Sequence, residues 1–300
     1  MHNQDRVIVR RIDPSVLLAV LLFFLLAAIT QAGADRSHGL LWAISKPGLQ
    51  TSYLFGTIHS QDVAVVSLPA PVKQTFDESD RVVLEVVLDA QAKQYSSKAF
   101  LMLDGRQLAY ITVQPLYDKV VAGMAARGIP APVLNRMKPW AAAVTLSLPP
   151  RGSGQILDML LYQQALQQGK AVHGLESIQE QLAIFDALSE REQLVMLRDA
   201  IESLPQLDAL YTGMLELYRQ RDINGLMAIN ESYKTQGDQQ LAAEFQRRII
   251  DERNELMLDR MQPLLETGNT FIAVGALHLP GEAGLLSLLE EQGYSIRKVY

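Results

Sequence analysis

The chain has 300 residues, of which 48% are hydrophobic and 20% are charged, and it contains no cysteine. This balance is typical of a globular protein with a sizeable core, and the lack of cysteine excludes disulfides, thiolate metal ligands and cysteine nucleophiles. The formal net charge of −6 comes without a basic cluster, which argues against nucleic acid as a partner.

Residues 1–34 have the pattern of a signal peptide. Three arginines, Arg6, Arg10 and Arg11, precede an apolar run from Val16 to about Ile29, and Ala32-Gly33-Ala34 fits a cleavage site. The run is shorter than the roughly 20 residues of a membrane-spanning helix, so we favour cleavage over a retained N-terminal anchor. We therefore expect a periplasmic or secreted protein that meets a membrane only through an uncleaved N-terminus.

The N-terminal third is predicted to alternate strands and helices. Leu40–Ser45 and Ser52–Phe55 flank a Pro47-Gly48 turn and predict a hairpin. A short helix from Pro69 to about Ser79 and a valine-rich strand follow. The strand is expected at Arg81–Leu88 and further helices at Ala90–Leu103, Leu108–Arg127 and Leu134–Leu148, with a break or kink at Pro115.

The second half is predicted to be mostly helical between two short strands. After a loop at 149–154, a helix is expected at Gln155–Gln168 and a strand at Ala171–Leu175, and Ser177 with Glu180 forms a capping box. Helices are then expected to about Glu266, with breaks near Pro205, Asp222 and Gly237. The closing elements are strand Thr270–Val274, helix Gly281–Gln292 and edge strand Ser295–Val299.

These elements predict an α/β fold with one central mixed β-sheet flanked by helices. Strands lie near both ends of the mature chain, and the terminal segments must pair within one sheet if the histidines that follow these strands are to meet. The helices of the C-terminal half form a long helical insert. We expect residues 35–300 to form a single domain.

An apolar strand followed by Gly-x-x-His occurs twice, at Gly56–His59 and at Gly275–His278. A histidine just beyond a strand is presented at the sheet edge, where α/β folds place their ligand crevices. Two imidazoles and a carboxylate are ligands that zinc, manganese, cobalt or iron accept. The pattern is common by chance, however, and a hydrogen-bonded structural role for either histidine stays open.

Glu85 is the one carboxylate inside the apolar strand, and Arg253 interrupts an apolar helical stripe. A buried carboxylate requires a cation, a hydrogen-bond network or a metal. Arg253, with Asn254 beside it, could pair with Glu85 or stabilise negative charge on a substrate. The alternative is that its guanidinium snorkels to solvent.

Other polar residues carry weaker signals. Glu176 follows a strand just before a helix cap, where the helix dipole alone would explain an acid. His173 is either an additional ligand or, preferably, an edge residue, and Trp140 should pack in the core. There is no Gly-x-Ser-x-Gly elbow, no phosphate-binding glycine loop and no His-Glu-x-x-His motif.

Six short motifs in order resemble the TraB/GumN family, from about residue 37 to the C-terminus. They are LFGTIH (54–59), VLEV (83–86), KPW (138–140), GLE (174–176), RN (253–254) and VGALHLPG (274–281). That family is similar to the Tiki ectodomains, which are metal-dependent proteases, and more distantly to erythromycin-esterase-like and ChaN-like proteins. The resemblance implies an active site of His59, Glu85 and His278, supported by Glu176, Arg253 and Asn254.

The leading hypothesis is therefore an exported metal-dependent hydrolase, in the first place a peptidase, that acts on a peptide or small-molecule substrate. His59 and His278 would bind manganese, cobalt or zinc, and Glu85 would be a third ligand or the general base. Arg253 would stabilise the oxyanion. The alternatives are a metal-free esterase-like hydrolase and a non-catalytic haem or small-ligand binding protein. The oligomeric state is left open.

Overall fold

A six-stranded mixed β-sheet carries the fold of the computed structural model, which describes residues 36–149, 154–234 and 239–300. The strands are β1 (Leu41–Ser45), β2 (Ser52–Thr57), β3 (Arg81–Val86), β4 (Ala171–Glu176), β5 (Thr270–Gly275) and β6 (Ser295–Lys298). Their order in the sheet is β4-β3-β5-β2-β1-β6. The predicted α/β class with a central mixed sheet is confirmed.

The remaining elements are helical. They are α2 (Val63–Val66), α3 (Ala70–Glu78), α4 (Ala90–Ala99), α5 (Leu108–Ile111), α6 (Gln114–Ala125), α7 (Ala131–Leu134), α8 (Pro139–Ser147), α9 (Leu157–Gln167), α10 (Ile178–Asp186), α11 (Glu190–Ser203), η1 (Leu204–Gln206), α12 (Leu207–Gln220), α13 (Ile223–Lys234), α14 (Gln239–Gln246), η2 (Arg247–Asp251), α15 (Glu252–Thr267), η3 (Ala276–His278) and α16 (Leu285–Glu291). Within the described ranges, no helix combines the length and the apolar character of a membrane span. The predicted signal peptide, residues 1–34, lies outside them.

Four neighbouring strands of the sheet run parallel, and this alignment positions the site. β1 and β2 form the predicted antiparallel hairpin, and β6 is an edge strand on β1. β2 pairs with β5, β5 with β3 and β3 with β4, all parallel. In the β2–β5 register Gly56 is opposite Val274 and Thr57 is opposite Gly275. Both Gly-x-x-His motifs therefore lie at the same edge of the sheet, as the sequence predicts.

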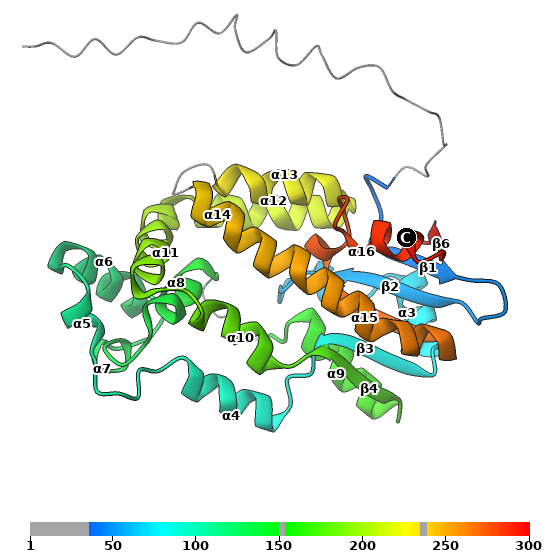
Figure 1. Ribbon diagram of the computed structural model, residues 1–300, viewed down its shortest axis with the longest axis horizontal. Coiled ribbons are helices and arrows are strands. Elements are labelled where there is room, and N and C mark those ends of the chain that lie inside the picture. The colour runs from blue at the N-terminus through cyan, green and yellow to red at the C-terminus, as the bar shows by residue number, and fades with distance from the viewer. Residues whose placement is uncertain (1–35, 150–153, 235–238) are drawn as a thin grey trace, which may run out of the picture. The chain divides into compact units, whose positions relative to one another are not determined.

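The sheet is covered by a long helical segment from the C-terminal half. Figure 1 shows α14 and α15 as one nearly continuous helix that crosses in front of the sheet, joined by the π-helical turn η2. Met257, Met261 and Leu265 of α15 are buried in the same core as Phe271 and Ile272 of β5. Apolar strands buried in this way are typical of a parallel sheet inside an α/β fold.

A second core lies in the helical part of the chain. Trp140 is fully buried there, and its indole Nε1–H donates to Asp186 Oδ1 at 2.8 Å, so the predicted core role is confirmed. Lys138 is the N-cap of α8 and Pro139 its first residue, and Lys138 Nζ donates to the same carboxylate at 2.7 Å. The Lys-Pro-Trp motif therefore starts a helix and anchors it.

Proline, strand pairing and helix capping set several of the observed element boundaries. Leu108–Arg127 is split into α5 and α6 just before Pro115, which confirms the predicted break. The predicted strand ending at Leu88 stops at Val86, where its pairing with β4 ends. The capping box of Ser177 and Glu180 is confirmed.

Three predicted helices are shorter than expected. The one ending at Leu103 stops at Ala99, and the one at Leu134–Leu148 is α7 followed by α8, since Pro139 starts a new helix. The last predicted helix starts at Leu285 rather than Gly281. The breaks near Pro205 and Asp222 are confirmed, and Gly237 lies outside the described residues.

Candidate functional site

The predicted site residues come from the carboxyl ends of four adjacent parallel strands. His59 follows β2, His278 lies in η3 after β5, and Glu85 and Glu176 lie near the ends of β3 and β4. Arg253 and Asn254 come from the first turn of α15. The carboxyl ends of parallel strands are where α/β sheets bind ligands.

His278 is buried and its ring is held in one tautomer. Its Nδ1 lies 2.6 Å from Asn254 Oδ1, while Asn254 Nδ2 donates to the carbonyl of Ala283 at 2.7 Å. Because the amide nitrogen of Asn254 is committed to Ala283, its oxygen faces His278 and accepts a hydrogen bond from Nδ1–H. The lone pair of His278 is therefore on Nε2, which lies 3.9 Å from Glu85 Oε2. Burial lowers the pKa of His278 to about 4, so the ring is neutral at pH 7, as a metal ligand must be.

Glu85 is held by donors on both carboxylate oxygens. The backbone N–H of Gly275 donates to Oε2 at 2.9 Å, and Gln181 Nε2 donates to Oε1 at 2.8 Å. Arg253 Nη2 forms an ion pair with Oε1. Burial alone would raise the pKa of Glu85, but His278, Arg253, the Gly275 amide and His59 outweigh it and hold the pKa at about 2. Glu85 is therefore an ionised carboxylate.

Arg253 bridges the two carboxylates and does not snorkel to solvent. Its Nε lies 3.0 Å from both oxygens of Glu176, its Nη2 donates to Glu176 at 2.6 Å and also meets Glu85, and its Nη1 donates to the carbonyl of Ile249 at 3.0 Å. The Glu176 side chain is only 1% exposed, so pairing with Arg253 explains this acid better than a helix dipole does. Each guanidinium nitrogen already donates within the protein.

The sequence analysis did not predict two parts of this network. Gln181 on α10 donates to both Glu85 and Glu176. The π-helical turn η2 directly precedes Arg253 and supplies the Ile249 carbonyl that Arg253 binds. Such π-turns within long helices occur frequently at functional sites.

His59 differs from His278 in being exposed. Its side chain is 62% exposed, and its Nε2 lies 3.6 Å from Asp158 Oδ2. The charge of His59 is nevertheless among the influences that lower the pKa of Glu85 and of His278, after the larger effects of burial and of nearer groups. The acid that lies beside the His59 ring is therefore Asp158, and the influence of His59 on Glu85 and His278 is a minor electrostatic one.

The separation of Glu85 and His278 fits a shared metal ion. Two atoms that each lie about 2.1 Å from an ion are at most about 4.2 Å apart, and Glu85 Oε2 and His278 Nε2 are 3.9 Å apart. Across the described residues, no group of three or more histidine, aspartate or glutamate side chains stands ready to hold a metal. His173 is exposed on edge strand β4, as the sequence predicts.

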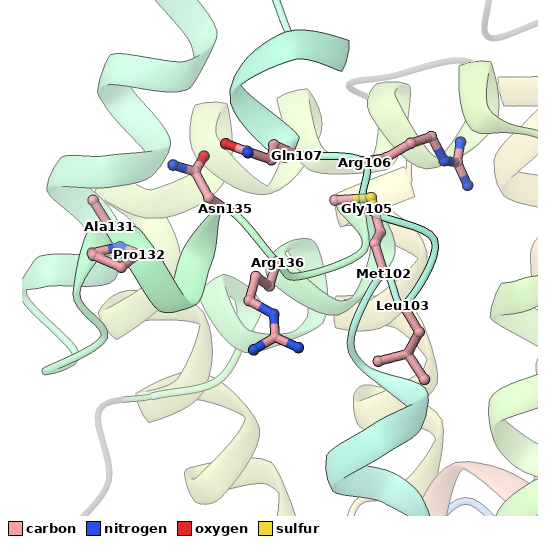
Figure 2. Close-up of a pocket in the computed structure, with 9 residues that line it drawn as sticks. All are labelled: Met102, Leu103, Gly105, Arg106, Gln107, Ala131, Pro132, Asn135 and Arg136. Carbon is pink, nitrogen blue, oxygen red and sulfur yellow. The ribbon is translucent and has the colours of Figure 1, made fainter.

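One cavity borders the predicted site residues, and another lies apart from them. One of about 510 Å³ is lined by Glu176, Glu180 and Arg260, among others. Another, of about 620 Å³, is shown in Figure 2 and contains none of the predicted site residues. Its lining comes from the loop after α4 and from α7 with the residues that follow: Met102, Leu103, Gly105, Arg106, Gln107, Ala131, Pro132, Asn135 and Arg136.

The two motif glycines make room for different neighbours, which predicts different effects of alanine. A Cβ on Gly56 would lie 2.7 Å from Leu279 Cδ1 and 3.1 Å from Ala276 Cα, within the turn that carries His278. Gly56→Ala should therefore cost about 1–3 kcal/mol of folding free energy. A Cβ on Gly275 would meet Glu85 Oε2 at 3.4 Å and His278 Cδ2 at 3.5 Å, which are ordinary contacts.

Gly275→Ala should consequently keep the stability of the wild type. It should weaken the binding of any ligand held between Glu85 and His278, because the added methyl group lies against both side chains. Chemical denaturation and metal-binding titration of both variants would check the contrast. Equal stability losses in the two variants would contradict it.

Comparisons with known proteins concern the whole sequence and point to one family. A sequence model of the TraB/PrgY/gumN family matches residues 40–298. The chain is 26% identical to metalloprotease TIKI2 of Danio rerio, over 86% of this chain and 60% of the relative. It is 24% identical to metalloprotease TIKI1 of Danio rerio, over 86% and 63%, and 26% identical to a metalloprotease TIKI homolog of Amphimedon queenslandica, over 95% and 66%. The chain thus spans less than two thirds of the length of these relatives.

Proposed function

The chain belongs to the TraB/PrgY/gumN family, and on this premise we propose that it is a metal-dependent hydrolase, in the first place a peptidase. The observation that carries the proposal is the pair of Glu85 Oε2 and His278 Nε2, 3.9 Å apart at the carboxyl ends of β3 and β5. The relatives named metalloproteases support the metal dependence. Export through the N-terminal segment is part of the same proposal.

Glu85 and His278 would hold the ion in the observed arrangement, and the exposed His59 would have to move toward them to become a third ligand, because the described residues contain no ready set of three. Nitrogen and oxygen ligands of this kind suit manganese, cobalt or zinc. When bound, such an ion supplies Lewis-acid chemistry: it polarises a carbonyl and makes a water molecule more acidic. Asn254 keeps the lone pair of His278 on Nε2, and a hydrogen bond of this type typically raises metal affinity.

The surroundings of Glu85 favour a ligand role over a general-base role. A general base works best with a pKa near the working pH, whereas the pKa of Glu85 is held at about 2. Gly275, Gln181 and Arg253 also fix its orientation, which suits an atom that must stay in place.

Arg253 would act in the first place by neutralising Glu85 and Glu176. Its Nε–H and both Nη2–H groups donate to the two carboxylates, and one Nη1–H donates to the carbonyl of Ile249, so most of its donors serve the protein. Its positive charge allows two acids to remain ionised side by side next to a metal site. This is the role we propose for it.

A hydrolysis screen with and without a chelator tests the proposed function. The purified protein is incubated with fluorogenic peptide and ester libraries, then with EDTA, then with EDTA followed by excess manganese, cobalt or zinc. We expect peptide cleavage that EDTA abolishes and one of the metals restores. Ester cleavage that survives EDTA would favour the metal-free esterase-like hydrolase. No turnover together with a bound chromophore or ligand would favour a non-catalytic haem or small-ligand binding protein.

A further inference from the structure

Asp158 carries an unexplained buried oxygen next to His59. It lies in the first turn of α9, and its Oδ2 is buried with no hydrogen-bond partner, the one such side-chain atom in the described parts of the chain. Its other oxygen, Oδ1, accepts a hydrogen bond from the Thr57 hydroxyl at 2.8 Å. A helix N-terminus favours an acid, but it does not explain why one carboxylate oxygen is buried without a donor, because an unpaired buried acceptor is costly.

The imidazole of His59 is a candidate donor beside this oxygen. Its Nε2 lies 3.6 Å from Asp158 Oδ2, so a small ring movement would close a hydrogen bond of normal length. Tyr218 also lies near Asp158: burial raises the pKa of its hydroxyl, and the charge of Asp158 raises it further. That hydroxyl is not available to Asp158, because it donates to the carbonyl of Gly56 at 2.9 Å. Thr57, two residues before His59, anchors the other side of the carboxylate.

We propose that Asp158 is the positioning residue of His59: its Oδ2 accepts a hydrogen bond from Nε2–H, which leaves Nδ1 as the ring nitrogen with a free lone pair. The two histidines would then be held in the same manner from opposite ring nitrogens. His278 donates through Nδ1 to Asn254 and keeps Nε2 free, whereas His59 donates through Nε2 to Asp158 and keeps Nδ1 free. Carboxylates commonly orient metal-binding histidines in this way. Only the binding of an ion by His59 rests on the proposed function.

The ring protonation of His59 tests the inference without any metal. ¹⁵N NMR of the metal-free protein, at a pH well above the usual pKa of histidine, reports which nitrogen carries the proton. We expect a larger Nε2–H fraction at His59 than at the exposed His173, and a smaller fraction in Asp158→Ala, which removes both acceptor oxygens. The matched control is Asp186→Ala, since that carboxylate is held by Lys138 and Trp140 and should not affect His59.

Two outcomes of this measurement would overturn the proposal. One is a wild-type His59 that carries its proton on Nδ1, and the other is an unchanged Nε2–H fraction in Asp158→Ala. If Asp158→Ala does not fold, the comparison of His59 with His173 in the wild type still decides.

Zinc affinity then separates positioning from direct binding. Asp158→Ala should weaken Zn²⁺ binding about 10–100-fold, and His59→Ala should weaken it at least as much. If Asp158 acts through His59, the double variant binds no more weakly than His59→Ala alone. An equal loss from Asp158→Ala in both backgrounds would overturn the positioning role. If His59→Ala binds zinc like the wild type, the proposed ligand role of His59 fails instead, and the NMR result alone decides on Asp158.

Discussion

Replacing Arg253 with methionine should lower the free energy of unfolding by about 3–5 kcal/mol. The substitution removes the positive charge between Glu85 and Glu176, whose side chains are 14% and 1% exposed. Both carboxylates would then be left in the interior without a counter-charge, and one or both would have to take up a proton or draw in water. Urea denaturation of the wild type and the variant measures the loss.

A matched control is available on the same helix. Arg260 also pairs with a glutamate, but it and Glu180 are 37% and 41% exposed, so Arg260→Met should cost no more than about 1 kcal/mol. Adding Glu176→Gln to Arg253→Met removes one of the two stranded charges and should recover part of the stability. Similar losses in Arg253→Met and Arg260→Met would contradict the account of a buried charge network.

Replacing His278 with alanine should weaken the binding of zinc or cobalt more than about 100-fold, because loss of an outer residue that merely orients a ligand already costs 10–100-fold. His278 presents Nε2 toward Glu85, and Asn254 fixes that orientation. Asn254→Ala should accordingly give the smaller, orienting effect. Competition titrations with a chelator of known affinity measure the metal affinity of the wild type and of both variants.

His173→Ala provides the control for this series. His173 is exposed on edge strand β4, so its loss should leave metal affinity unchanged. Thermal unfolding of each variant shows whether a weakened affinity reflects a lost ligand or a lost fold. A folded His278→Ala variant with wild-type affinity would exclude His278 as a ligand.

The position of the site was predictable from the sequence because strand patterns are local and registers follow from them. Apolar runs before Gly56 and Gly275 predicted strands, and pairing of the terminal segments placed both histidines at one sheet edge. Glu85 was predictable as a site residue because an isolated acid within an apolar strand requires a partner. The same reasoning identified Arg253 as a candidate partner, and the ion pair is present.

The organisation of the polar network could not be predicted in the same way. Gln181 and Asp158 lie on ordinary amphipathic or capped helices, where a polar residue needs no special explanation. Their partners are far away in sequence, 96 residues from Gln181 to Glu85 and 101 residues from Thr57 to Asp158. Only the packing of α9 and α10 against the sheet brings them together, and helical periodicity alone does not specify that packing.

The role of Arg253 also depended on geometry that a sequence pattern does not contain. The pattern left open a contact with Glu85, with a substrate or with solvent. The structure shows that Glu176 accepts hydrogen bonds from both Nε and Nη2 of Arg253. The Ile249 carbonyl in η2 accepts a hydrogen bond from Nη1. A π-turn inserts one residue into the helical repeat, so the regular apolar stripe that Arg253 interrupts could not locate it.

The most direct test of the central claim is the metal content of the purified protein after loading with manganese, cobalt or zinc and removal of unbound ions. Elemental analysis would compare the wild type with His59→Ala and His278→Ala. We predict a stoichiometric ion in the wild type, and a marked loss in both variants while they remain folded. Equal and negligible metal in all three proteins after loading would contradict a metal centre at the two Gly-x-x-His motifs.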